Sequence, residues 1–195
     1  MIVCRKLKLL FAHVPKTGGS AVTAALLPYI YKRPVKRIGE HGWQPPLHEI
    51  GNMHSPWKDI KSQATKFLDQ GFRLAATHRS PYERVASLYH KLGLDRPIEE
   101  FVLDRDRRYA WWFQQAVDVA GPMVTDWLDY ECLERDLQEL LKACGVEEPA
   151  PMIQTNVTPN KQPAWKILTP QAVEIIRKRF ADDIKIFGYE PPEEL

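Results

Sequence analysis

A glycine turn between an apolar run and a helical pattern, near the start of the chain, leaves few folds open. Residues 7–14 are mostly apolar and fit a buried strand, which ends at Pro15. A lysine, two glycines and two hydroxyl residues follow, and a helical pattern continues over residues 21–26. The first N–H groups of that helix and the positive end of its dipole point at the turn. This segment therefore predicts an anion-binding site.

The residues of the turn indicate which anion is bound. Gly18 and Gly19 let the backbone approach a ligand without a Cβ in the way, while Lys16, Thr17 and Ser20 add one charge and two hydroxyls. We expect a phosphate or sulfate ester. A Walker-type loop places its lysine after the glycines, with a hydroxyl for Mg²⁺. In this chain Lys16 precedes both glycines, which argues against an ATPase.

Two motifs together resemble a known family. The segment His13–Ser20 resembles the 5′-phosphosulfate loop of the sulfotransferase superfamily, especially its carbohydrate-type branch, sulfotransferase family 2. Residues 77–89 resemble the family's 3′-phosphate element, in which an arginine ends a strand and a serine follows eight residues later. Arg79 and Ser87 have this spacing. The guanidinium of Arg79 suits a phosphate dianion, and Ser87 would add a hydroxyl from the following helix.

Later segments extend the resemblance over nearly the whole chain. Residues 129–137 resemble a strand-to-helix segment of the family, although Asp129 and Cys132 stand where arginine and asparagine are common. Residues 156–189 resemble the family's closing pattern. Within that pattern Lys161 lies in a loop that either closes over the nucleotide or leaves the lysine in solvent.

The resemblance implies transfer of a sulfuryl group from 3′-phosphoadenosine 5′-phosphosulfate to an acceptor hydroxyl of a sugar or small alcohol. The product nucleotide would be adenosine 3′,5′-bisphosphate, and Lys16 would neutralise the bridging oxygen as that oxygen gains charge. No metal is expected, because the sequence has no obvious carboxylate pair for Mg²⁺. The donor-binding residues that the resemblance implies are Pro15, Lys16, Thr17, Gly18, Gly19, Ser20, Arg79, Ser87 and Lys161.

A histidine is the expected catalytic base, because a side chain with a pKa near 6.5 offers a neutral nitrogen at neutral pH. His54 best matches a histidine that the family carries between its first helix and its second core strand. His41 and His48 lie in the same loop and remain alternatives. Glu40 and Glu49 also remain, since other branches of the superfamily use a glutamate.

Two other functions compete with sulfuryl transfer. A P-loop-type nucleotide kinase or phosphotransferase would use a loop of similar shape, but the order of Lys16 and the glycines argues against it. A non-catalytic relative would bind a nucleotide or a sulfated glycan. The joint presence of Lys16, Ser20, Arg79 and Ser87 disfavours that reading.

Strands alternating with helices predict an α/β fold with a central, mainly parallel sheet flanked by helices. We expect the three-layer arrangement of P-loop nucleotide hydrolases, in one domain spanning residues 1–195. Strands are predicted over residues 7–14, 72–77 and 123–130. Helices are predicted from Trp57 to Gly71, from Pro81 onward, and over residues 97–103, 107–119, 132–144 and 169–180.

Charge and composition narrow the partners. The net charge of +2 argues against a protein that coats nucleic acid, but residues 1–40 hold eight lysines and arginines against one acid. That local charge of +7 would steer a polyanionic nucleotide toward the turn. Three cysteines without metal-ligand spacing predict reduced thiols in the cytoplasm. No apolar run approaches the ~20 residues that span a bilayer. Because Golgi members of the family that the chain resembles carry a membrane anchor, the resemblance implies a soluble, bacterial-type enzyme. No pattern identifies the acceptor or the oligomeric state.

Overall fold

The computed structural model describes residues 1–30, 49–52, 54–92, 96–103, 111–152 and 162–192. In these residues a four-stranded sheet has the order β1-β2-β3-β4, with β1 at Ile2–Cys4, β2 at Leu9–Ala12, β3 at Arg73–His78 and β4 at Asp126–Asp129. Strand β1 pairs antiparallel with β2, whereas β2, β3 and β4 run parallel. The predicted α/β architecture with a mainly parallel sheet flanked by helices is confirmed.

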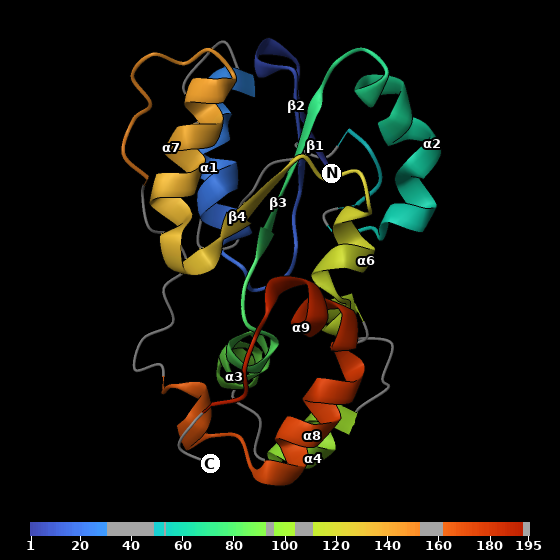
Figure 1. The fold of residues 1–195 in the computed structure, drawn as a ribbon, viewed down its shortest axis with the longest axis vertical. Coiled ribbons are helices and arrows are strands. Elements are labelled where there is room, and N and C mark those ends of the chain that lie inside the picture. The colour runs from blue at the N-terminus through green and yellow to red at the C-terminus, as the bar shows by residue number, and fades with distance from the viewer. Residues whose placement is uncertain (31–48, 53, 93–95, 104–110, 153–161, 193–195) are drawn as a thin grey trace.

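The two faces of the sheet are covered by different helices, as Figure 1 shows. Helices α1 (Gly19–Ile30) and α7 (Leu133–Ala143) lie on one face, and helices α2 (Trp57–Leu68) and α6 (Ala116–Ala120) lie on the other. Parallel strands that are covered on both faces must be apolar throughout. This explains why every residue of β2 is buried.

Successive residues of β2 point into two separate cores, as the alternation of a strand requires. Leu9 and Phe11 pack in a core that includes Leu26 of α1 and Leu137 of α7. Leu10 and Ala12 pack in a second core on the opposite face. That second core is completed by residues of β1, β3, α2 and α6, including Met1, Val3, Leu74, Trp57, Ile60, Ala64 and Ala120.

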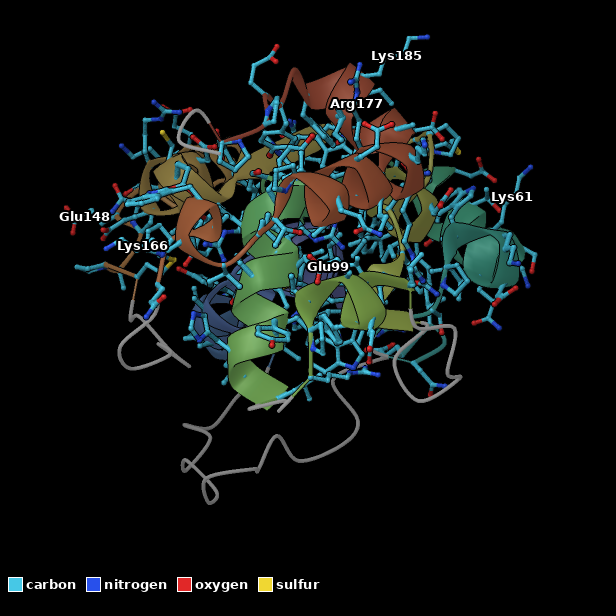
Figure 2. The ribbon with its side chains drawn as sticks, turned by 90° about the horizontal axis from the view of Figure 1, so that it is seen from below. Lys61, Glu99, Glu148, Lys166, Arg177 and Lys185 are labelled. Carbon is cyan, nitrogen blue, oxygen red and sulfur yellow. The ribbon has the colours of Figure 1, made fainter. Side chains whose placement is uncertain are left out.

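Beyond the carboxyl ends of the parallel strands lies a helical layer (Figure 1). It consists of α3 (Pro81–Leu92), α4 (Ile98–Leu103), α8 (Pro170–Arg179) and α9 (Ala181–Phe187). These helices share a third core, formed largely by the aromatic and aliphatic residues Tyr82, Val85, Leu88, Phe101, Val102, Phe113, Ile176 and Phe180. Figure 2 shows the layer from its own end, with Arg177 and Lys185 extending outward. Ligands of open α/β sheets bind at the strand ends that this layer faces.

Short 3₁₀ turns connect these elements. They are η1 (Arg5–Leu7), η2 (Trp111–Phe113), η3 (Tyr130–Cys132) and η4 (Ala164–Lys166). The strand predicted over residues 7–14 is wrong at both ends, because β2 covers only Leu9–Ala12 and η1 includes Leu7. Lys8 has a left-handed backbone (φ 47°) that a strand cannot adopt, so the chain folds back and β1 pairs with β2. At the other end, the pairing with β3 stops at Ala12.

Two further predictions needed correction in the described residues. The strand predicted over 123–130 is limited to β4, because Asp129 accepts a hydrogen bond from the N–H of Glu131 and begins η3. The helix predicted over 107–119 is interrupted after η2, since Gln115 has extended backbone (ψ 149°) and caps the start of α6. Helices α2, α3, α4, α7 and α8 agree with their predicted positions.

Candidate functional site

The predicted anion loop joins β2 to α1 at the carboxyl edge of the sheet. Lys16 has a left-handed backbone (φ 62°) and Gly18 does too (φ 81°). A lysine in this region is uncommon and costs free energy, which is typical of functional loops. Helix α1 begins at Gly19, and the carbonyl of Gly18 accepts the N–H groups of Ala21 and Val22. The N–H groups of the first helical turn therefore point toward the loop.

Both glycines are required by close packing. A Cβ on Gly18 would lie 2.5 Å from Cδ2 of Leu133 and 3.2 Å from Cδ2 of Tyr130. A Cβ on Gly19 would lie 2.2 Å from Cδ2 of His13. The loop is therefore clamped between the start of α7 on one side and the His13 ring on the other.

Thr17 fastens the loop to β3. Its side chain is fully buried, and its Oγ1 donates to the carbonyl of Val14 over 2.9 Å. The Oγ1 atoms of Thr17 and Thr77 lie 2.5 Å apart. Because the Thr17 proton is used on Val14, Thr77 is the donor in this second bond. The Thr17 hydroxyl thus fixes the loop and has no proton left to donate to a ligand. Pro15 is buried beside it and Ser20 is half-buried in the first turn of α1.

Arg79 brings the second predicted motif against the first. Its Nη1 donates to the carbonyl of Lys16 over 3.4 Å, and its Nη2 donates to Oε2 of Glu83 over 3.1 Å. The guanidinium also lies over the ring of Tyr130, 3.9 Å from the centroid. Arg79 is 4% exposed, and its Nε has no hydrogen-bond partner among the described residues. Ser87 is equally buried on α3.

His54 lies on the other side of the loop, beside His13. Its Nδ1 is 2.8 Å from the carbonyl oxygen of His13, and the two rings meet edge to face at 4.9 Å. A ring nitrogen facing a carbonyl must carry the proton, so Nε2 is the basic nitrogen of this tautomer. Burial lowers the pKa of His54 to about 4, and the charge of Arg84 contributes in the same direction. The ring is therefore neutral at pH 7.

Trp112 extends this side of the site. Its ring centroid lies 6.4 Å from that of His54, and the Nζ of Lys91 lies 5.6 Å from the Trp112 ring. A tryptophan face suits the flat surface of a sugar or an aryl group. The structure thus places an aromatic surface next to the candidate base.

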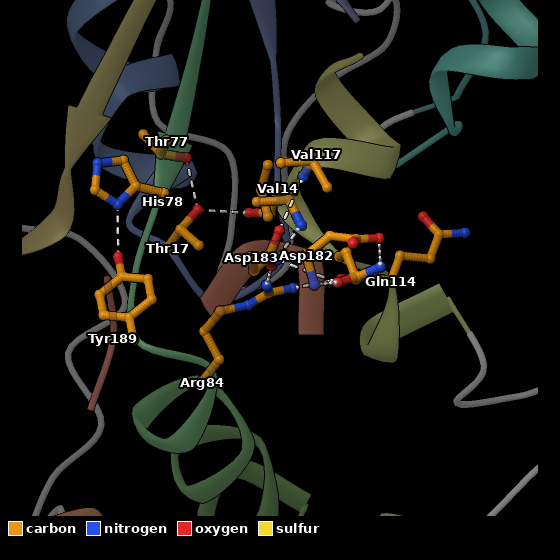
Figure 3. A network of polar contacts seen from close by, with 12 residues as sticks. Val14, Thr17, Thr77, His78, Arg84, Gln114, Val117, Asp182, Asp183 and Tyr189 are labelled. Carbon is orange, nitrogen blue, oxygen red and sulfur yellow. Dashed lines mark hydrogen bonds and ion pairs between the residues drawn. The ribbon is translucent and has the colours of Figure 1, made fainter. Parts of the chain in front are cut away.

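A buried ion pair, which the spacing of residues did not predict, fixes the segment after Trp112 (Figure 3). Nη1 of Arg84 donates to Oδ2 of Asp183 over 3.0 Å, and Nη2 donates to the carbonyl of Gln114 over 2.7 Å. The same carboxylate accepts the N–H groups of Ala116 and Val117, so Asp183 caps α6. Burial raises the pKa of the Asp183 carboxyl, while Arg84 and both N–H groups oppose that rise.

A second unpredicted contact lies at the end of β3, also in Figure 3. Nδ1 of His78 and the hydroxyl of Tyr189 lie 2.5 Å apart, and the His78 ring stacks on Phe187 at 4.1 Å. Burial lowers the pKa of His78. The residue directly before Arg79 is thereby anchored to the segment that follows α9. Partners more than 100 residues apart leave no local signal in a single sequence.

Four of the predicted residues lie outside the described part of the chain. They are the donor-binding candidate Lys161 and the alternative bases Glu40, His41 and His48. The remaining alternative, Glu49, is described and forms an ion pair with Arg5.

Within the described residues, no group of three or more histidine, cysteine, aspartate or glutamate side chains is arranged to hold a metal ion. In the same part of the chain, no helix is both long and apolar enough to cross a bilayer.

Comparison with protein families gives one match that spans almost the entire chain. A family model described as "Sulfotransferase family", of the sulfotransferase family 2 type, matches residues 1–190. No curated protein and no solved structure matches the chain.

Proposed function

The chain belongs to the sulfotransferase family, and on that premise we propose that it transfers a sulfuryl group from 3′-phosphoadenosine 5′-phosphosulfate to an acceptor hydroxyl. The observation that carries the proposal is the 3.4 Å contact between Arg79 and the Lys16 carbonyl. It brings the two predicted anion-binding segments together, so a single nucleotide with phosphates at both its 5′ and 3′ positions can reach both. We also propose the fold of P-loop nucleotide hydrolases and a cytoplasmic location.

The residues at the strand ends fit this donor. The turn at 15–20 supplies backbone N–H groups at the start of a 12-residue helix, which suit the phosphosulfate. Arg79 is buried and its Nε–H has no hydrogen-bond partner among the described residues, and Ser87 lies two turns into α3. These two side chains are assigned to the 3′-phosphate, and Lys161 is proposed as a further donor-binding residue. The donor supplies the activated sulfuryl group itself.

Lys16 and His54 are assigned to the transfer step. The acceptor oxygen forms its bond to sulfur as the bond between sulfur and the bridging phosphate oxygen breaks. Lys16 stabilises the negative charge that develops on the departing phosphate. His54 accepts the acceptor's proton at Nε2, and its Nδ1–H bond to the His13 carbonyl stabilises the imidazolium that results. Adenosine 3′,5′-bisphosphate then leaves.

The acceptor is assigned to the side of the site formed by His54 and Trp112. The ring distance of 6.4 Å leaves the Trp112 face within reach of an acceptor whose hydroxyl lies at His54. A sugar or a small alcohol is the acceptor class that we propose, because sugars present both a hydroxyl and a flat apolar face.

Calorimetric measurement of nucleotide binding in the absence of metal ions tests the proposed identity of the donor. We expect adenosine 3′,5′-bisphosphate to bind in EDTA at least tenfold more tightly than ATP, since two separate anion-binding segments each receive one phosphate. A kinase would instead prefer ATP and would require Mg²⁺. Equal affinity for the two nucleotides, or an ATP affinity that depends on Mg²⁺, would contradict the proposal.

A further inference from the structure

Arg79 is held on three sides by the protein. One face of its guanidinium lies over the Tyr130 ring. Its Nη1 donates to the Lys16 carbonyl, and its Nη2 donates to Glu83. In the part of the chain that the structure describes, Nε is the nitrogen left without a hydrogen-bond partner. A long arginine side chain loses much rotational freedom in such a position. The orientation of its remaining N–H groups is therefore set before any ligand arrives.

Glu83 is the residue that connects this arginine to the rest of the helical layer. Its Oε2 accepts from Arg79, and its Oε1 accepts the backbone N–H of Ala164 over 2.9 Å. Both carboxylate oxygens are therefore used, and each serves a different element. A glutamine has only one acceptor oxygen and cannot reproduce both bonds.

The same face of α3 holds the segment that contains Ala164. Glu83, Ser87 and His90 follow the i, i+4, i+7 spacing, which places them on one side of a helix. Nε2 of His90 accepts the N–H of Gln162 over 3.2 Å, and Glu83 accepts the N–H of Ala164. Ser87 lies between these two attachment points along the helix. Glu83 thus helps to orient Arg79, and it also helps to hold residues 162–164 against the helix that carries Ser87.

We propose that Glu83 is a positioning residue for the donor's 3′-phosphate. It orients the Arg79 guanidinium so that the remaining N–H groups face that phosphate, and it holds residues 162–164 against the same helix. This inference rests on the proposed function, because it assumes a nucleotide with a 3′-phosphate. Glu83 itself is acidic and is not expected to contact the phosphate.

The test compares adenosine 3′,5′-bisphosphate with adenosine 5′-monophosphate, which lacks the 3′-phosphate. The measured quantity is the ratio of their dissociation constants, obtained by calorimetry at high salt, where long-range charge effects are screened. In Glu83→Ala we expect the preference for the bisphosphate to fall roughly tenfold, since ordering one side chain costs about that factor. Glu83→Gln, which keeps one acceptor oxygen, should lower the preference by a smaller factor.

Glu99→Ala is the matched control. Glu99 is also in the first turn of a helix, and its carboxylate also holds the C-terminal part of the chain, by accepting from the hydroxyl of Thr169. Figure 2 labels Glu99 on α4. This variant tests for a purely structural effect, and we expect its preference for the bisphosphate to match that of the wild type.

Each outcome separates the two proposals. An unchanged or increased preference in Glu83→Ala would overturn the positioning role, because removal of a negative charge alone strengthens phosphate binding. An equal fall in Glu99→Ala would overturn it as well. If the wild type shows no preference for the bisphosphate, the proposed donor is wrong and not merely the role of Glu83.

Discussion

Two arginines near the start of α3 have almost the same burial but different surroundings. Arg79 and Arg84 are 4% and 3% exposed, and each forms an ion pair. The partner of Arg79 is Glu83, whose side chain is 25% exposed, whereas the partner of Arg84 is Asp183 at 1%. We call the first pair open, because solvent reaches its carboxylate, and the second closed, because both of its side chains are buried.

The comparison shows that burial of an arginine does not by itself mark a binding residue. Within the described ranges, Nε of each arginine has no hydrogen-bond partner, so this feature does not distinguish them either. The difference lies in the neighbours. Arg79 borders the loop through Lys16 and a partly exposed carboxylate, while Arg84 joins the carbonyl of Gln114 to a carboxylate that caps α6. We therefore assign ligand binding to Arg79 and stabilisation of the fold to Arg84.

A substitution in the closed pair, Arg84–Asp183, should cause the largest loss in the free energy of unfolding. Asp183→Asn leaves Arg84 charged and buried without a counter-charge, and it turns an amide group toward the N–H groups of α6. Loss of one partner of a buried pair typically costs about 3–5 kcal/mol, so we expect unfolding in denaturant to show a decrease of that size.

The Arg73–Asp126 pair supplies the control for this prediction. Arg73 is 42% exposed and donates to both carboxylate oxygens of Asp126. Because solvent reaches the guanidinium of this pair, we expect Asp126→Asn to cost about 1 kcal/mol, which is less than the loss expected in Asp183→Asn. If Asp183→Asn and Asp126→Asn lost similar stability, burial of an ion pair would not determine its contribution to the fold.

A substitution in the open pair, Arg79–Glu83, should show the reverse pattern. We expect a moderate effect on nucleotide binding and a small one on the free energy of unfolding. Arg79→Ala should weaken adenosine 3′,5′-bisphosphate about 30-fold, which corresponds to about 2 kcal/mol for hydrogen bonds to a charged group. The affinity for adenosine 5′-monophosphate should change less than threefold. Calorimetry with both nucleotides measures the difference.

Arg135→Ala controls for the loss of a positive charge, since Arg135 also pairs with a neighbouring carboxylate, that of Asp136, but is 65% exposed. We expect both affinities to remain unchanged in this variant. Equal losses for the two nucleotides in Arg79→Ala would remove Arg79 from the 3′-phosphate site.

Separation along the sequence explains which features of the fold and the site the sequence alone could predict. The loop at 15–20 and the Arg79/Ser87 spacing were predictable because each motif lies within a few residues along one strand-to-helix connection. The same locality allowed α2, α7 and α8 to be placed. Their shared location at the strand ends followed from the parallel sheet.

Contacts between distant segments were not predictable in this way. The Arg84–Asp183 pair joins residues 99 positions apart, and the Glu83–Ala164 bond joins residues 81 apart. Thr17 was expected to offer its hydroxyl to the ligand, but the hydroxyl has two protein partners, Val14 and Thr77. A residue type indicates that a group can donate, whereas the fold decides which acceptor lies nearest.

The smallest effect is expected at the candidate base. Burial lowers the pKa of His54 to about 4 from the ordinary 6.5, with smaller contributions in the same direction from the charges of the N-terminus and Arg84. The ring should therefore gain almost no charge between pH 7 and pH 5.5. An NMR titration of the His54 ring, assigned by comparison with His54→Gln, measures this directly.

The same shift has a defined consequence for stability. Unfolded His54 takes up a proton as the pH falls through about 6.5, whereas folded His54 does so only near 4, so the unfolded state binds more protons within that window. The contribution of His54 to stability is thus present above pH 6.5 and is lost as the pH falls toward 4, and His54→Gln should flatten that part of the curve. A ring that titrates at pH 6 or above would show that His54 is solvated, and the neutral base of the proposed transfer would have to be sought in another residue.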